Sequence, residues 1–120
     1  AFIINILLNF EIIVLPNYNN NEVLLKCIEE LKIYFARDKW QINQPILLRD
    51  VFILLDKIKG VQTVKDVIIS NKAGTTSGYS QYSYDIEGAT QNKVIYPSLD
   101  PSIFEVKFPN QDIKGKVVPL

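Results

Sequence analysis

Residues 19–69 read NNNEVLLKCIEELKIYFARDKWQINQPILLRDVFILLDKIKGVQTVKDVII, and this stretch decides the fold. In two parts of it, apolar residues recur at three- and four-residue spacing, which is typical of helices that bury one face. Asn19 can cap the first helix through its side chain, and Glu22 stands three residues later, as in a capping box. We expect the apolar face of this helix to pack against a sheet. That face consists of Leu24, Cys27, Ile28, Leu31 and Phe35.

The second helix also has recognisable ends. Pro45 suits its first turn, because a proline there lacks only an amide that has no acceptor within the helix. Gly60 fits just past its end, where glycine accommodates a left-handed backbone. The β-branched residues from Val61 to Ile69 then predict a strand. The apolar stripe of this helix consists of Leu48, Val51, Leu55 and Ile58.

The first fifteen residues, AFIINILLNFEIIVL, are largely apolar. The run is too short to span a membrane comfortably, contains Asn5, Asn9 and Glu11, and lacks the basic flank of a signal peptide. It therefore predicts a buried strand that ends at Pro16, with no membrane insertion. Because the chain contains no methionine, we expect it to be a fragment of a longer protein.

After Asn71 the chain becomes rich in glycine, serine, threonine and tyrosine, and prolines become frequent. Residues 74–78 predict a loop. Alternation of large apolar with polar residues predicts two strands, one over Tyr82–Ile86 and one over Ile103–Phe108. Because the prolines break this half into short extended pieces, we expect residues 71–120 to form an arm that adds to a neighbouring subunit.

Together these patterns predict an α+β fold. Residues 1–70 are expected to form a strand, two helices and a second strand, with both helices on one face of a small mixed or antiparallel sheet. Residues 71–120 are expected to form a β-rich C-terminal extension. The chain of 120 residues is long enough to bury a hydrophobic core.

The sequence contains no histidine and only one cysteine. Catalytic sets that use histidine, and metal sites with histidine ligands, are therefore excluded within this chain. Cys27 falls on the apolar face of the first helix and is expected to act as a small hydrophobic residue. The acidic residues lack calcium-loop spacing, and residues 74–78 lack the Lys-Ser/Thr of a phosphate-binding loop. We expect no catalytic site, no cofactor and no metal.

The charge balance and the aromatic residues indicate which kinds of partner to expect. Thirteen basic and thirteen acidic residues leave no net charge, so nucleic-acid binding is not expected. Trp40 fits two roles equally well, an interface anchor or a side chain folded back over the core. Tyrosines after residue 78 can contact a protein or a glycan, or can pack on a β surface. The candidate interface residues are Trp40, Tyr82, Tyr84, Tyr96, Phe104 and Phe108.

The order of these features resembles a known family. An apolar helix ending in Tyr34-Phe35, a short loop, a second helix reading ILLRDVFILLDKIKGV and then a β run are similar to the C-terminal domain of baseplate J-like proteins. These proteins are wedge components of contractile phage tails and related injection machines. The likeness covers about residues 10–70. The later segment NKVIYPSLDPSIFEVKFPNQDIKGKVV resembles, more loosely, segments that follow this domain in some large phage wedge proteins.

The resemblance implies a non-enzymatic structural protein of the virion, located in the tail baseplate and assembled in the host cytoplasm. Its implied partners are other baseplate and tail proteins in a hetero-oligomeric assembly. Two other classes stay open. One is a receptor- or glycan-binding module of a phage tail, built around the tyrosines and Trp40. The other is a small enzyme that uses a pair of carboxylates, although no suitable pair stands out in the sequence.

Overall fold

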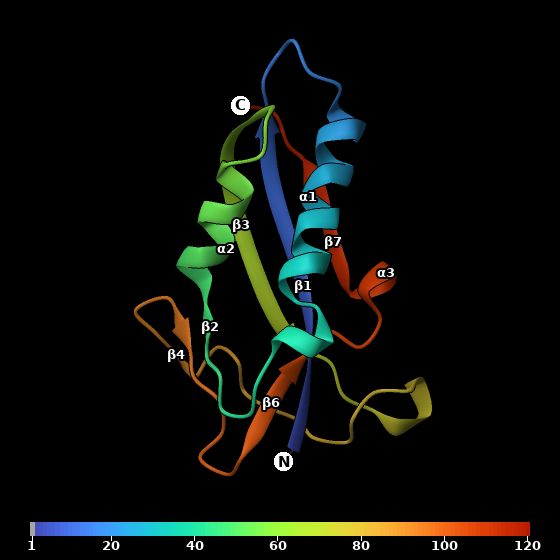
Figure 1. Ribbon diagram of the computed structural model, residues 1–120, viewed down its shortest axis with the longest axis vertical. Coiled ribbons are helices and arrows are strands. Elements are labelled where there is room, and N and C mark those ends of the chain that lie inside the picture. The colour runs from blue at the N-terminus through green and yellow to red at the C-terminus, as the bar shows by residue number, and fades with distance from the viewer. Residues whose placement is uncertain (1) are drawn as a thin grey trace.

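A long N-terminal strand, β1 (Phe2–Val14), forms the centre of the fold (Figure 1). The computed structural model describes residues 2–120, and at Arg37 it describes the backbone alone. β1 pairs antiparallel with β3 (Val61–Asn71) along one edge. Along its other edge it pairs in parallel with β6 (Ser102–Glu105) and β7 (Ile113–Val117). The sheet is therefore mixed, with β1 in its interior.

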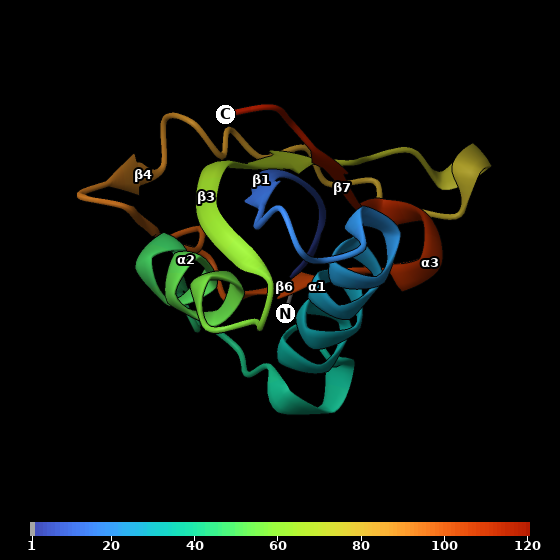
Figure 2. The same ribbon diagram turned by 90° about the horizontal axis from the view of Figure 1, so that it is seen from above.

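Two helices, α1 (Asn20–Tyr34) and α2 (Leu48–Asp56), lie on the same face of this sheet (Figure 2). The expected α+β fold, with two helices on one face of a mixed sheet, is thus confirmed. A short helix, α3 (Pro109–Asp112), precedes β7, and single 3-10 turns lie at Arg37–Lys39 and Thr75–Ser77.

A second, smaller sheet lies beside the N-terminal end of α2. It contains β2 (Ile46–Leu47), β5 (Val94–Ile95) and β4 (Thr90–Gln91), with β5 in the middle and both pairings antiparallel. This sheet ties the loop before α2 to the second half of the chain.

The hydrophobic core lies between the sheet and the two helices. β1 contributes every second residue to it, as expected for a strand with one face buried. These residues are Ile4, Ile6, Leu8, Phe10 and Ile12. They meet Val23, Cys27 and Leu31 from α1 and Val51 and Leu55 from α2, which all belong to one cluster of buried side chains. The predicted apolar faces of both helices therefore point inward.

The N-terminus of α1 is capped as predicted: the Glu22 amide donates to Asn19 Oδ1 at 3.1 Å. Replacing Asn19 with alanine is expected to lower the free energy of unfolding by about 1 kcal/mol, because a first-turn amide loses its acceptor. Urea titration measures this loss. Asn21→Ala, an exposed change in the first turn, is the matched control, and equal losses in the two variants would contradict the assigned cap.

The expected role of Pro45 is wrong. α2 starts at Leu48, after Ile46 and Leu47 have paired as β2 with β5. Because β5 supplies partners for these two residues, the chain stays extended for longer than the proline signal predicts. The predicted helix end is also misplaced: α2 ends at Asp56 with Lys57 as its C-cap, three residues before Gly60. Gly60 does have the expected positive φ, of 101°, and a Cβ there would lie 2.7 Å from a methyl carbon of Val23.

The expected separate arm over residues 71–120 is also wrong. β6 and β7 pair with β1, and Ile95, Phe104 and Ile113 belong to the same buried cluster as the helices. β3 covers only one edge of β1, so the other edge needs partners for its amides and carbonyls. The second half of the chain supplies them, and the expected boundary at residue 70 does not separate two cores.

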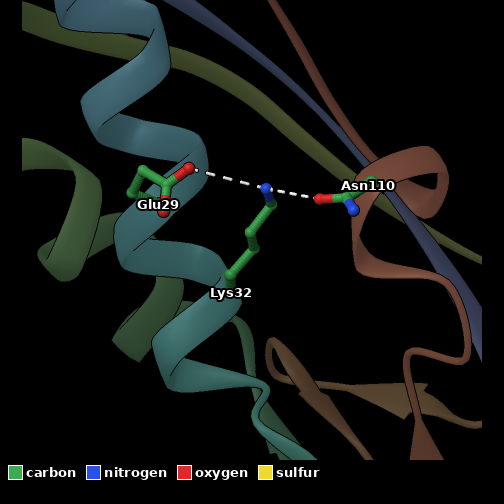
Figure 3. Close-up of polar contacts among 3 residues, drawn as sticks. All are labelled: Glu29, Lys32 and Asn110. Atoms are coloured by element: carbon green, nitrogen blue, oxygen red, sulfur yellow. Dashed lines mark hydrogen bonds and ion pairs between the residues drawn. The ribbon is translucent and has the colours of Figure 1, made fainter.

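The strand expected over Tyr82–Ile86 is not present, since this segment has an irregular backbone. The strand expected over Ile103–Phe108 is partly right: β6 ends at Glu105, and Pro109 then begins α3. α3 is joined to α1 through Lys32, whose Nζ lies 2.7 Å from Asn110 Oδ1 and 3.5 Å from Glu29 Oε1 (Figure 3).

Candidate functional site

Residues 72–86, which we call the strap, cross the face of the sheet that points away from α1 and α2 (Figure 2). The strap begins directly after β3 and leads to the small sheet at β4. It has no regular secondary structure apart from the turn at Thr75–Ser77. Hydrogen bonds that mostly involve side chains, together with ring contacts, hold it in place.

Asn5 anchors the middle of the strap. Its side chain is 1% exposed, although it lies on the strand face opposite the core. Its Oδ1 accepts from the Ser80 amide at 2.7 Å, and its Nδ2 donates to Glu105 Oε1 at 3.1 Å. Its backbone oxygen accepts from the Lys72 amide and from Asn71 Nδ2, each at 2.9 Å. One buried amide side chain thus joins β1, β6 and the strap.

Tyr79 anchors the strap near α3. Its hydroxyl donates to Asp112 Oδ1 at 2.8 Å, and its ring meets Phe108 edge-on with centroids 5.3 Å apart. Burial of the phenol, and its hydrogen bond to the Asp112 carboxylate, raise the pKa of Tyr79. Phe108, a predicted interface residue, is therefore half-buried against the strap.

Tyr84 anchors the other end of the strap. Its amide donates to Asn71 Oδ1 at 2.9 Å, and its hydroxyl donates to the Tyr96 carbonyl at 2.7 Å. Its ring lies 6.1 Å from that of Phe104. Burial, and then the nearby Asp85 charge, raise the pKa of Tyr84. Tyr84 is half-buried and Phe104 only 2% exposed, so Phe104 is a core residue rather than a contact for a partner.

Several large apolar side chains are exposed at the start of β1 and in the segments that precede β6, and Figure 1 shows the N-terminus beside the loop before β6. Phe2 and Tyr82 are each 37% exposed, with ring centroids 4.3 Å apart, and Tyr96 is 48% exposed. Ile3 is similarly exposed, and Leu99 projects fully into solvent. We call Phe2, Ile3, Tyr82, Tyr96 and Leu99 the aromatic end.

The aromatic end contains two of the predicted interface residues, Tyr82 and Tyr96. Sequence reasoning missed Phe2, because the opening run predicts a strand that is buried throughout. It also missed Leu99, which stands alone between polar residues and prolines. Phe2 continues the alternating series of buried positions along β1, so the sequence pattern does not show where the strand leaves the core.

Trp40 lies elsewhere, at the exit of α1. It is 8% exposed, and its ring stacks on Phe35 with centroids 5.4 Å apart and an interplanar angle of 11°. Its Nε1 donates to the Tyr34 carbonyl at 3.0 Å. Of the two roles expected for Trp40, the structure has the second, a side chain folded back over the core.

A groove of about 600 Å³ separates α1 from α2. Lys26 and Glu30 line it from α1, and Asp50, Lys57 and Lys59 line it from α2 and the turn that follows. The charged residues that line the groove are of both signs. Tyr34 lies in its wall, and the pKa of Tyr34 is raised mainly by burial and also by the negative charge of Asp50. Within residues 2–120, cysteine and acidic side chains form no group of three or more that could hold a metal ion.

Cys27 is completely buried, and burial raises the pKa of its thiol from 9.0 to about 11. We expect the native protein to resist a thiol reagent at pH 8, and to react only after unfolding, because the attacking species is the thiolate. Stability should also fall as the pH rises from 9.0 towards 11, since the unfolded thiol loses its proton first. Reaction of the native protein at the rate of a free cysteine would contradict the protection expected for this thiol.

No protein-family model matches the chain, and no match emerges among curated protein sequences. No helix formed by residues 2–120 has the length and apolar composition needed to cross a membrane.

Proposed function

We propose that this protein is a non-enzymatic structural component of a contractile phage tail, a baseplate wedge subunit or part of one. In this role it binds neighbouring tail proteins through the aromatic end. The observation that carries the proposal is the exposed ring pair of Phe2 and Tyr82, together with the exposed Tyr96. Phe2 lies on β1, Tyr82 lies on the strap and Tyr96 follows β5; hydrogen bonds from Asn5 and Tyr84 fix the strap.

The chemistry of the aromatic end suits a protein interface. Aromatic side chains supply large apolar contact area, and truncating such an anchor at an interface centre often costs 2 kcal/mol or more of binding free energy. Phe2 and Tyr82 already contact each other, so little side-chain freedom is lost when a partner covers them. The phenol groups of Tyr82 and Tyr96 can meet polar groups at the rim.

The baseplate assignment draws its support from the sequence likeness over residues 10–70. In the structure that region supplies the C-terminal end of β1, both long helices and nearly all of β3. The proposed location in the baseplate wedge of a virion rests on the same likeness, and so do the proposed hetero-oligomeric partners. The experiment that follows tests them together.

The test is native mass spectrometry of the protein, alone and mixed with the products of its neighbouring genes. A heteromeric mass is expected, and Tyr82→Ser combined with Tyr96→Ser should weaken that complex at least about tenfold, as expected for loss of aromatic anchors. Tyr18→Ser is the matched control, because Tyr18 is also 37% exposed but follows the opposite end of β1. An unchanged complex in the double variant would overturn the interface assignment.

A receptor- or glycan-binding module is the second candidate, favoured by the same exposed rings, since sugars also stack on aromatic faces. A glycan array separates the two. Binding of a defined glycan that Tyr82→Ser abolishes, with no heteromeric mass, would replace the assembly role.

A further inference from the structure

β3 has one open edge. Within residues 2–120 it pairs only with β1. Immediately after β3, the Lys72 amide donates to the Asn5 carbonyl at 2.9 Å, so Lys72 faces β1. Backbone groups of successive strand residues point to opposite edges. Counting back from Lys72, the backbone groups of Asn71, Ile69 and Val67 therefore point away from β1.

The two halves of this edge differ in how well they are protected. Near Lys65 the pairing with β1 is irregular, with a register shift between Glu11 and Ile12, and the neighbouring side chains are polar and exposed. Bulges and charges of this kind keep other strands from adding to an edge. The Val67 amide is occupied by Asp66 Oδ1 at 2.9 Å, whereas no bond from this side reaches the backbone of Ile69 within residues 2–120.

A groove of about 560 Å³ runs along the less protected half. Residues 67–71 of β3 line one side and residues 84–87 with Thr90 line the other, while Leu48 and the buried Ile95 complete the lining. Ile68 is 54% exposed at the same edge. The groove thus combines unpaired backbone groups with apolar walls, which are the two elements that recognition by strand addition uses.

The charges in this groove have a single sign. Asp85 and Glu87 are its charged lining residues, and neither lysine nor arginine lines it. Both side chains are exposed. Asp85 also accepts from the Gly88 amide at 3.0 Å, which fixes the turn that carries both carboxylates. A cationic side chain in the groove would therefore meet two carboxylates and no competing cation.

We infer that this groove binds an extended peptide segment of another protein, which adds as a strand to β3 at residues 67–71. Its apolar side chains alternate with polar ones, and a lysine or arginine lies opposite Asp85 and Glu87. The groove differs from the aromatic end, and the inference does not depend on the proposed function.

The probe is the peptide Lys-Val-Lys-Ile-Lys-Val, acetylated and amidated, titrated into the intact protein and followed by NMR. At saturation, hydrogen exchange of the Ile69 amide is expected to slow by about tenfold or more, because this amide gains an acceptor. Two control peptides test the chemistry. One has proline in place of isoleucine and therefore lacks a backbone amide donor in its centre. The other has glutamate in place of each lysine. Neither should protect Ile69.

Glu87→Lys should weaken the lysine peptide by about three- to fivefold or more, as expected for loss and reversal of an exposed charge pair. Asp56→Lys changes net charge equally at an exposed site on α2 and should leave affinity unchanged. Three results would overturn the inference: no protection at millimolar peptide, equal weakening in both variants, or protection confined to the groove between α1 and α2. Protection of Ile69 by self-association without peptide would also overturn it, since the occupant would then be a second copy.

Discussion

Replacing Gly115 with alanine is expected to destabilise the protein by about 3 kcal/mol, as for a severe overpacking of a core. Gly115 lies opposite Phe10 in the register of β1 and β7, and a Cβ built on it would lie 2.1 Å from Phe10 Cζ. Phe10 is 2% exposed, so its ring is enclosed by the core and can move only by displacing other side chains. Urea titration of the variant measures the loss as a lower unfolding midpoint.

A second substitution tests the cause. In a Phe10→Leu background the same Gly115→Ala change should cost at least about 1 kcal/mol less, because the contacting ring atoms are gone and the two sites are coupled. Lys114→Ala, an exposed neighbour on β7, should change stability by less than about 0.5 kcal/mol. Strictly additive effects of the Gly115 and Phe10 changes would contradict the assigned steric clash.

Replacing Asn5 with leucine is expected to lower the free energy of unfolding by about 2 kcal/mol, because partly buried polar partners lose their hydrogen bonds. Leucine has a similar volume but cannot accept from the Ser80 amide or donate to Glu105, as Asn5 does. The strap should loosen before the core does. Amide exchange at Ser80 and Tyr84 is therefore expected to accelerate more than exchange within β1.

Asn9→Leu is the matched control for this change. Asn9 lies on the same strand and the same face of the sheet but is exposed, so its replacement should alter stability by less than about 0.5 kcal/mol. Similar losses for Asn5→Leu and Asn9→Leu, with no local change in exchange, would show that Asn5 does not anchor the strap.

The sequence predicted the parts of the fold that depend on local signals. The spacing of apolar residues in α1 and α2, the Asn19 cap and the Gly60 turn are each set by residues a few positions apart. Pro45 shows the limit of such signals. Its local preference for a first helical turn yields to the pairing of Ile46 and Leu47 with β5, which lies far along the chain.

The second half of the chain was harder to predict for the same reason. Its short strands carry little periodicity, and their place in the sheet follows from the free edge of β1, which no local pattern describes. The candidate site was predicted in part. Tyr82 and Tyr96 stand out by composition, whereas the exposure of Phe2 and the burial of Phe104 depend on contacts between distant segments. Asn5 likewise looks like a polar interruption of an apolar strand, and its role is evident only once the strap that it anchors is known.

The central position of β1 has a consequence for biosynthesis. The ribosome makes β1 before the strands that flank it, and its parallel partner β7, which begins at Ile113, is made after β3 and β6. Until then the edge of β1 over residues 8–12, which pairs with β7, has no intramolecular partner, and such exposed edges are prone to aggregate. Folding of this sheet must therefore finish after β7 has been translated. A nascent or shortened chain that lacks β7 is expected to need a chaperone to stay soluble.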